Sequence, residues 1–456
     1  MHCECANDIR LSTSLTIRKS FKRLPTVIEW ARFRECAGRM RKLSGNPNFL
    51  SSETLPVLQL CTINEPLLPN LKTLDLWGVS GRFVHFIPLF LSLRVTSISL
   101  KFVSGLPKAT VASTVSTLPT LCPNLQVIAL LSLPIDPMIT VAVSGMVLAT
   151  NRNTIQALRV YSPLTEEAGE LIFKSPGLRS LSVLIEWETS LPPASLPNLT
   201  ELRIKCDDEG GWPRLFHGAT FGKLESVTFY PKSEEIGDFL GAFERVALSS
   251  SVQNTLSTFC VSAACSWSPN YSSLLSLTHL VNLTIEFGCG DECSSTVDDD
   301  IVIILSQAMP KLQVLKLGDE PCQEFAIGAT ANGLVALALH CPELRDLCIH
   351  IQVASLGAPP VNPGIEPASS WTDCVLVNLV VGEIPVPESA LVVALTLLRI
   401  FPRIERIDSI QDEWREVEDA IRLSKSIVGC SSKHSLTRPR SNLNDTSIEA
   451  TFKTDG

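Results

Sequence analysis

Cysteine and histidine are the residue types in this chain with the greatest capacity for chemistry, and their spacing decides whether they can perform it. The chain has 15 cysteines and 7 histidines in 456 residues. The closest cysteine pairs are Cys3 with Cys5 in "CEC" and Cys289 with Cys293 in "CGDEC". Neither pair is accompanied by a second pair or a histidine doublet at zinc-finger spacing. We therefore predict no metal site, and we interpret most cysteines as small buried residues in a reducing compartment.

Motifs for catalysis are absent from the sequence. It contains no GxSxG, no GxxxxGK[ST], no HExxH and no GxGxxG opening a helix. His340 and Cys341 are adjacent in "LHCPEL", but neighbours point apart on a strand or turn, so we interpret them as structural. The acidic run Asp298 to Asp300 precedes an apolar segment and is expected to cap a helix rather than bind a cation. We predict no enzymatic activity and no cofactor, with an enzyme on this scaffold as the remaining alternative.

One pattern, apolar-x-x-apolar-x-apolar, recurs along the chain and is preceded in its clearest copies by Pro-Asn or a near equivalent. Clear copies are "LPNLKTLDL", "CPNLQVIAL", "LPNLTELRI", "MPKLQVLKL" and "CPELRDLCI". The first apolar residues of the units are Leu71, Val95, Leu125, Ile155, Leu178, Leu199, Leu224, Leu256, Leu280, Leu312, Leu344, Leu376 and Ile404. These thirteen units are 21 to 32 residues apart. Leucine-rich repeats have this period, about 20 to 29 residues with some longer forms.

Each unit is expected to contribute one short strand and one return segment. In the unit that starts at Leu71, alternation sends Leu74 and Leu76 into the core and leaves Asp75 and Trp77 on the opposite face. Neither the strand nor the return segment can bury its apolar face alone, so neighbouring units must stack. The sequence therefore predicts an α/β leucine-rich-repeat solenoid, a curved horseshoe with parallel strands on the concave face and helices or short turns on the convex face.

The longer units are expected to return through helices. The segment 233–250 places apolar residues at steps of three and four, the segment 298–312 begins with acidic residues that suit a helix N-terminus, and the segment 388–402 ends on a proline. Units of 21 to 25 residues are expected to return by a short 3-10 turn or coil. The alternative is a doubly wound α/β enzyme. The repeated Pro-Asn-Leu register and the lack of a glycine fingerprint at any strand-to-helix turn count against it.

The remaining segments flank this array. We expect an irregular segment at 1–23, a basic capping and joining segment at 24–66, repeats at 67–410, a C-terminal capping helix at 411–425 and a disordered tail at 426–456. A Pro-rich surface loop is expected at 357–370. Trp414, Val417 and Ile421 lie at helical spacing in the C-terminal cap.

Between Ile17 and Gly45 the chain carries nine Lys or Arg, and a nucleic-acid-binding arm is one interpretation. We favour a capping helix, because apolar residues of this segment fall on one helical face and leave the basic residues in solvent. The net charge of −9 likewise argues against a nucleic-acid or membrane partner, and no apolar run reaches the roughly 20 residues of a membrane span. The N-terminus lacks the apolar core of a secretory signal, so we expect an intracellular protein, cytoplasmic or nuclear.

The irregular "LPNL..L.L" and "CP.L..L.I" units resemble the leucine-rich regions of F-box proteins. The phrase "EWARFRECAGRMRKLSG", Glu29 to Gly45, followed by "LLPNLKTLDL", is similar to the segment that joins an F-box to its repeats in fungal F-box proteins. The resemblance covers about residues 24 to 410. Only Leu24, Pro25 and Trp30 match the F-box itself, so we expect that module to be truncated or missing in this chain.

The resemblance implies a non-enzymatic substrate-recognition part of an SCF-type ubiquitin ligase, which binds a target protein on its concave face. It implies a Skp-class adaptor and a cullin complex as partners only if an F-box is present upstream. The alternative function is a leucine-rich-repeat interaction or regulatory protein with no ubiquitin link. The candidate binding residues are the large or charged ones predicted on the concave face: Trp77, Lys101, Arg159, Tyr161, Arg203, Lys205, Tyr230, Glu286, Lys316, Asp346 and His350. Because basic groups gather in the middle units, we expect an acidic patch on the target.

Overall fold

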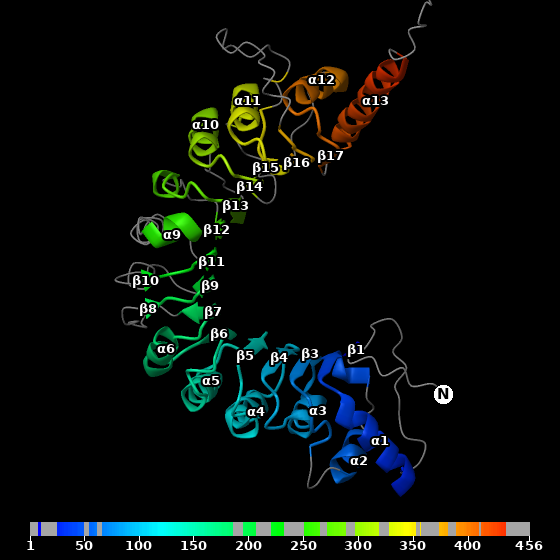
Figure 1. Ribbon diagram of the computed structural model, residues 1–456, viewed down its shortest axis with the longest axis vertical. Helices are drawn as coiled ribbons and strands as arrows, with labels where there is room; N and C mark the ends of the chain where they lie inside the picture. Colours follow the sequence, from blue (N-terminus) through cyan, green and yellow to red (C-terminus); the bar gives the residue numbers. More distant parts are fainter. Residues whose placement is uncertain are drawn as a thin grey trace, which may run out of the picture.

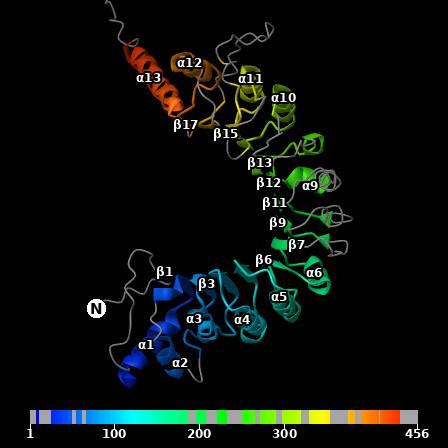
Figure 2. The same ribbon diagram turned by 180° about the vertical axis from the view of Figure 1, so that it is seen from behind.

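The computed structural model shows one long, curved array of strands with helices along its outer side (Figures 1 and 2). It describes residues 8–10, 25–49, 54–61, 66–185, 195–206, 220–231, 250–264, 271–288, 297–318, 328–352, 356, 374–381, 389–409 and 412–434. Within these ranges, fifteen strands form a single sheet, and every paired neighbour runs parallel. The predicted α/β leucine-rich-repeat solenoid is confirmed.

The strands of this sheet are β1 (Asp8–Arg10), β2 (Lys42–Gly45), β3 (Thr73–Val79), β4 (Ser97–Phe102), β5 (Val127–Leu131), β6 (Ala157–Pro163), β7 (Ser180–Ile185), β9 (Glu201–Cys206), β11 (Ser226–Pro231), β12 (Thr258–Ala264), β13 (Asn282–Gly288), β14 (Val314–Leu317), β15 (Asp346–Ile349), β16 (Asn378–Val380) and β17 (Arg406–Asp408). Two further strands, β8 (Ser195–Leu196) and β10 (Thr220–Phe221), pair with each other outside it.

The helices are α1 (Val27–Arg39), α2 (Thr54–Cys61), α3 (Gly81–Val84), α4 (Lys108–Leu121), α5 (Pro137–Ala149), α6 (Glu166–Phe173), α9 (Ser250–Thr255), α10 (Asp299–Ala308), α11 (Ala331–His340), α12 (Ala390–Ile400) and α13 (Glu413–His434). Three 3-10 helices are described, η1 (Pro47–Phe49), η2 (Ile87–Phe90) and η3 (Tyr271–Leu274). A helix is about 10 Å wide whereas strands lie about 4.8 Å apart. A stack with strands on one side and helices on the other must therefore curve, with the strands inside.

The predicted register of the repeats agrees with the strands of the sheet. From β3 to β17, each of the thirteen described sheet strands begins two residues after the first apolar residue predicted for its unit. These first residues are at most 1% exposed, as Leu71 and Ile404 illustrate at the two ends. In β3 the alternation is as expected, because Leu74 and Leu76 are buried and Trp77 is exposed.

The Pro-Asn lead-in is explained by hydrogen bonds between neighbouring units. The side-chain amide of Asn70 donates to the Gly38 carbonyl at 2.6 Å, and that of Asn124 donates to the Leu93 carbonyl at 3.1 Å. Asn198 likewise donates to a carbonyl of the preceding unit. Buried and half-buried carbonyls need such donors. In these three units the asparagine side chain therefore links the turn to the preceding unit by a hydrogen bond.

Two predicted boundaries differ from the structure at the N-terminal end. The segment 24–66, expected to cap the array, contains α1 but also supplies β2 to the sheet, where Leu43 pairs with Leu74. The segment 1–23, expected to be irregular, contains β1, which pairs with β2. A strand of three residues is too short to show alternation in sequence, and an open sheet edge offers unpaired backbone groups that favour its addition.

At the C-terminal end, α13 runs to His434, so the helix extends into the segment 426–456 that was expected to be disordered. Trp414, Val417 and Ile421 are buried against the last unit, and helix propagation adds one backbone hydrogen bond for each further residue.

The return segments follow unit length only in part. The helices expected at 298–312 and 388–402 are α10 and α12, and η3 is a 3-10 turn in a unit of 24 residues. The unit of 23 residues after β6 nevertheless returns through α6, so the rule for short units is wrong there. Most of the predicted helix at 233–250, and the predicted loop at 357–370, lie outside the described residues.

Candidate protein-binding surface

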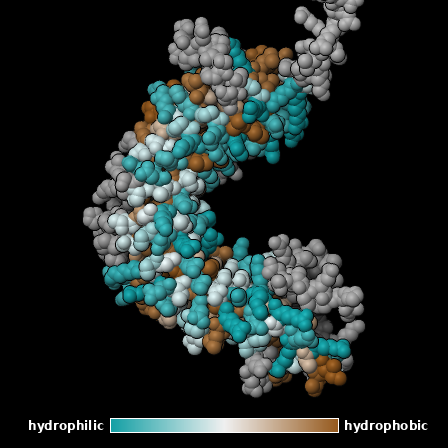
Figure 3. Space-filling model, viewed as in Figure 1, coloured by the Kyte–Doolittle hydropathy of each residue, from teal (hydrophilic) through white to brown (hydrophobic). Residues whose placement is uncertain are grey.

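The concave face consists of side chains that point away from the helices, in rows that cross the sheet from strand to strand. One row is fixed by the register of neighbouring strands, and part of it runs Arg159, Ser182, Arg203, Thr228, Cys260, Thr284, Lys316 and Cys348. Hydrophilic residues line much of the inner margin of the arc (Figure 3). Small residues occupy many row positions, so the few long side chains project above them.

Five of the predicted residues gather on adjacent strands in the middle of the arc. They are Arg159 and Tyr161 on β6, Arg203 and Lys205 on β9, and Tyr230 on β11. The strands β7, β9 and β11 are hydrogen-bonded in this order and β6 pairs with β7, so the five side chains share one continuous surface. We call these five residues the central cluster.

A fixed ion pair organises the central cluster. Arg203 Nε donates to Glu201 Oε1 at 2.6 Å, and the Ser180 hydroxyl donates to Glu201 Oε2 at 2.8 Å. Burial alone would raise the pKa of Glu201, but the Ser180 hydrogen bond and the charges of Arg203 and Arg159 hold it below its ordinary value. The carboxylate therefore stays charged and fixes the position of the Arg203 guanidinium.

Two tyrosines border these cations. The Ser182 hydroxyl lies 3.1 Å from the Tyr161 hydroxyl and hydrogen-bonds to it. Burial raises the pKa of Tyr230, and the nearby Cys260 contributes in the same direction. Tyr230 is thus a neutral phenol that can donate a hydrogen bond at neutral pH.

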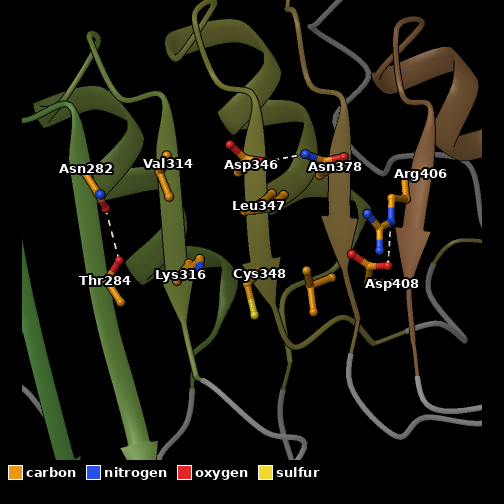
Figure 4. Close-up of a pocket in the computed structure, with 11 residues that line it drawn as sticks. Asn282, Thr284, Val314, Lys316, Asp346, Leu347, Cys348, Asn378, Arg406 and Asp408 are labelled. Atoms are coloured by element: carbon orange, nitrogen blue, oxygen red, sulfur yellow. Dashed lines mark hydrogen bonds and ion pairs between the residues drawn. The ribbon is translucent and has the colours of Figure 1, made fainter. Parts of the chain in front are cut away.

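A shallow hollow of about 380 Å³ lies further along the same face, on β13 to β17 (Figure 4). It contains the predicted residues Lys316 and Asp346. Its polar walls are largely satisfied internally, since Asn378 donates to Asp346 at 2.5 Å and Arg406 pairs with Asp408 at 2.8 Å. Among the described residues, no carboxylate forms an ion pair with Lys316, so this lysine is the free cation of the hollow.

The other predicted residues are more scattered. Trp77 and Lys101 are paired in register on β3 and β4, near the N-terminal end of the sheet. Glu286 faces the concave side on β13. His350 differs from them, because its ring lies against Gly328, where an added Cβ would come within 2.6 Å of Cδ2. Burial lowers the pKa of His350 to about 4. A largely shielded ring contributes little to a binding surface.

Sequence analysis missed the residues that support these side chains. Ser180, Ser182 and Glu201 position Arg203 and Tyr161, and Asn378 and Arg406 line the hollow. Ser180, Ser182 and Asn378 are uncharged and small or medium in size, whereas Glu201 and Arg406 are charged residues at the first position of their strands. The strand register would have placed them beside the predicted residues, since each occupies an outward position of its unit.

Cys122, Cys341 and Cys374 are buried thiols. Burial raises the pKa of the Cys341 thiol to about 12 and that of Cys122 to about 11. Cys341 Sγ donates to the carbonyls of Ser306 and Met309, at 3.6 and 3.5 Å. A thiol held in this way is not a nucleophile at neutral pH, which supports the structural interpretation of the His340–Cys341 pair.

The two close cysteine pairs, Cys3 with Cys5 and Cys289 with Cys293, lie outside the described residues. In the part of the chain that the structure describes, no group of three or more His, Cys, Asp or Glu residues is arranged to hold a metal ion. No helix of the described ranges is long and apolar enough to cross a membrane.

The fold and this surface define a leucine-rich-repeat-type solenoid with a polar concave face. No protein-family model matches the chain, and no curated protein sequence matches it. A chain in the crystal structure of the Rad7 and Elc1 complex in yeast is similar, with a TM-score of 0.38 and 13% identity, over 64% of this chain and 80% of that chain. A likeness at this level says nothing of what the present chain binds.

Proposed function

We propose that this protein is a non-enzymatic scaffold that binds a target protein on its concave face. The central cluster is the observation that carries this proposal. Extended rows of outward side chains are the surfaces that solenoids offer to partners, and Arg and Tyr are enriched where binding energy concentrates. Arg203 is already held in position by Glu201, which reduces the entropy lost on binding.

Site-specific photo-crosslinking tests this proposal. A photoreactive phenylalanine analogue at Lys101 or Lys316 samples the concave face, and the same analogue at Leu148 or Leu395 samples exposed positions on α5 and α12. The expected result is that one partner is crosslinked from both concave positions and from neither helical position. Crosslinking of that partner only from the helices, or of none from the concave face, would contradict the proposal.

The finer proposal follows from the resemblance of the repeats and of the Glu29 to Gly45 segment to F-box proteins. It assigns the protein to substrate recognition in an SCF-type ubiquitin ligase, with a Skp-class adaptor and cullin complex as partners where an F-box precedes the repeats. Val27 and Ile28, 87% and 69% exposed on α1, offer an apolar surface near that junction. If no adaptor co-purifies with the protein, the function becomes target binding without a ubiquitin link.

The proposed cellular location is intracellular, cytoplasmic or nuclear. It is supported by the cysteines of the described residues, six of which carry free thiols, with Cys122, Cys341 and Cys374 buried. Free thiols are typical of proteins from reducing compartments.

A further inference from the structure

The central cluster concentrates positive charge on a protein whose net charge is −9. Arg159 and Arg203 stand at the same row position on β6 and β9, with Ser182 of β7 between them. Ser182 is small and only 1% exposed, so the side chains around it cover this position and no large side chain of β7 separates the two arginines. Because two strand spacings separate them, their backbones lie about 10 Å apart.

The cations of the central cluster are Arg159, Arg203 and Lys205, and two of them form no ion pair among the described residues, although Glu201 also interacts electrostatically with Arg159. Neither Arg159 nor Lys205 forms an ion pair there, and only Arg203 is paired, with Glu201. The pairing uses Arg203 Nε and leaves the two terminal nitrogens of its planar fork for other acceptors. The cluster therefore has more positive charge than its own carboxylate neutralises.

The neighbouring row positions do not supply the missing charge. Ala129 precedes Arg159 in the row, and Thr228 and Cys260 follow Arg203. On the C-terminal side, the carboxylate of Glu286 on β13 also acts on Tyr230. The row of Arg159 and Arg203 is thus uncharged on both sides of the two arginines.

The hydroxyl donors continue this pattern. Lys205 pairs in register with Tyr230 on β11, so an ammonium and a phenol stand side by side. Tyr161 lies on β6, next to the Ser182 hydroxyl. A ligand that crosses these strands would meet hydrogen-bond donors on β6, β9 and β11.

We propose that the central cluster binds an acidic segment of the target protein, with Asp or Glu carboxylates on Arg159, Arg203 and Lys205. This inference rests on the proposed function and names the chemistry of its partner. A neutral or basic segment would partly desolvate three cations without replacing their water contacts. The cations are spread over several strands instead of converging on one point, and this spread suits several single-charged carboxylates better than one phosphate.

Fluorescence anisotropy on the full chain tests the inference. The probe is a fluorescein-labelled ten-residue peptide of alternating Glu and Ser, and its matched control has Gln in place of every Glu. The acidic peptide should bind, the Gln peptide should not, and the affinity should fall as salt is raised. Equal binding of both peptides, or binding unaffected by salt, overturns the inference.

Variants locate the binding on the cluster. The double variant Arg159→Gln with Lys205→Gln should weaken binding of the acidic peptide by at least about tenfold, because two charge-assisted contacts are lost. The charge-matched control is Arg152→Gln with Lys174→Gln, which alters exposed residues away from the concave strands and should bind like the unaltered chain. Unchanged affinity of the first double variant overturns the inference.

Two further experiments distinguish carboxylate binding from phosphate binding, and the inference from the proposed function on which it rests. A neutral peptide with one phosphoserine that binds more tightly than the Glu-Ser peptide overturns the carboxylate assignment. Photo-crosslinking at Lys101 and Lys316 reports on the proposed function independently. If it captures a partner while the acidic peptide fails to bind, concave-face binding stands and the acidic assignment falls.

Discussion

Individual residues of this protein join neighbouring units across their helix ends. The acidic run at the start of α10 caps helices in two ways. Asp298 caps its own helix by accepting from the Ile301 N–H at 3.0 Å. Asp299 instead caps the next helix, α11, by accepting from the Thr330 N–H at 2.7 Å and the Gly333 N–H at 3.1 Å. The predicted capping role is confirmed, and one of its residues acts between units.

Replacement of Asp299 by Ala should lower the free energy of unfolding by about 1 to 3 kcal/mol. The substitution removes a cap and leaves half-buried donors of α11 without acceptors. Asp300→Ala is the matched control, because it removes the same charge from the same turn at an exposed position. Thermal melts should show a clear loss of stability for Asp299→Ala and little loss for Asp300→Ala. Equal losses would mean that the contact with α11 contributes nothing.

His350 should make stability depend on pH. Its pKa lies near 4 in the folded protein because of burial, below the ordinary value of 6.5. Between these values the unfolded chain binds more protons, so this contribution to stability is fully present above about pH 6.5 and declines toward pH 4. In thermal melts from pH 7 to pH 4, the stability of the His350→Gln variant should decline less than that of the unaltered chain. The exposed His85→Gln variant should keep the slope of the unaltered chain.

The elements divide into repeating units and terminal caps. Strands that end the sheet leave backbone groups and apolar core open, and at the C-terminal end α13 packs beside α12 and β17. Trp414 is 1% exposed there and is among the largest fully buried side chains of the described residues.

Trp414→Ala should reduce the free energy of unfolding of the C-terminal units by about 3 to 5 kcal/mol, since it removes a large buried side chain and leaves a cavity. Leu423→Ala, on the same helix but 64% exposed, is the control and should change little. Limited proteolysis would detect earlier cleavage near α12 and α13 in Trp414→Ala. Resistance equal to that of Leu423→Ala would show that α13 does not protect the array.

The whole molecule is an arc in which each unit contacts its neighbours (Figure 1). The sheet order follows the chain order of the repeats, and the apolar core runs along the arc as one continuous cluster to which each unit adds its own residues. In such an array stability is close to a sum of units and their interfaces, so a disturbance should remain local.

Leu315→Ala in β14 and Leu100→Ala in β4 test this locality. Both residues are fully buried, and each substitution should cost about 2 to 5 kcal/mol. Hydrogen exchange followed by mass spectrometry should accelerate around β13 to β15 for Leu315→Ala and around β3 to β5 for Leu100→Ala. Acceleration throughout the chain for either variant would instead indicate one cooperative unit.

The sequence by itself determined the repeat, its register and the concave positions. Leu71 and its counterparts recur at a spacing that only stacking can satisfy, and strand alternation then assigns Leu74 to the core and Trp77 to the surface. These features depend on local periodicity, which is why they could be predicted. The chain's N-terminal strand β1 and the extension of α13 could not, since they depend on edges and contacts made elsewhere.

The tertiary structure alone decided which concave residues act together. Arg159, Ser182 and Arg203 are separated along the chain by whole units, yet the parallel register places them side by side. It also showed that Glu201 holds Arg203 and that the His350 ring lies against Gly328. The physical reason is that side-chain pairing, burial and charge depend on distances between units, and the length of the return segments does not reveal those distances.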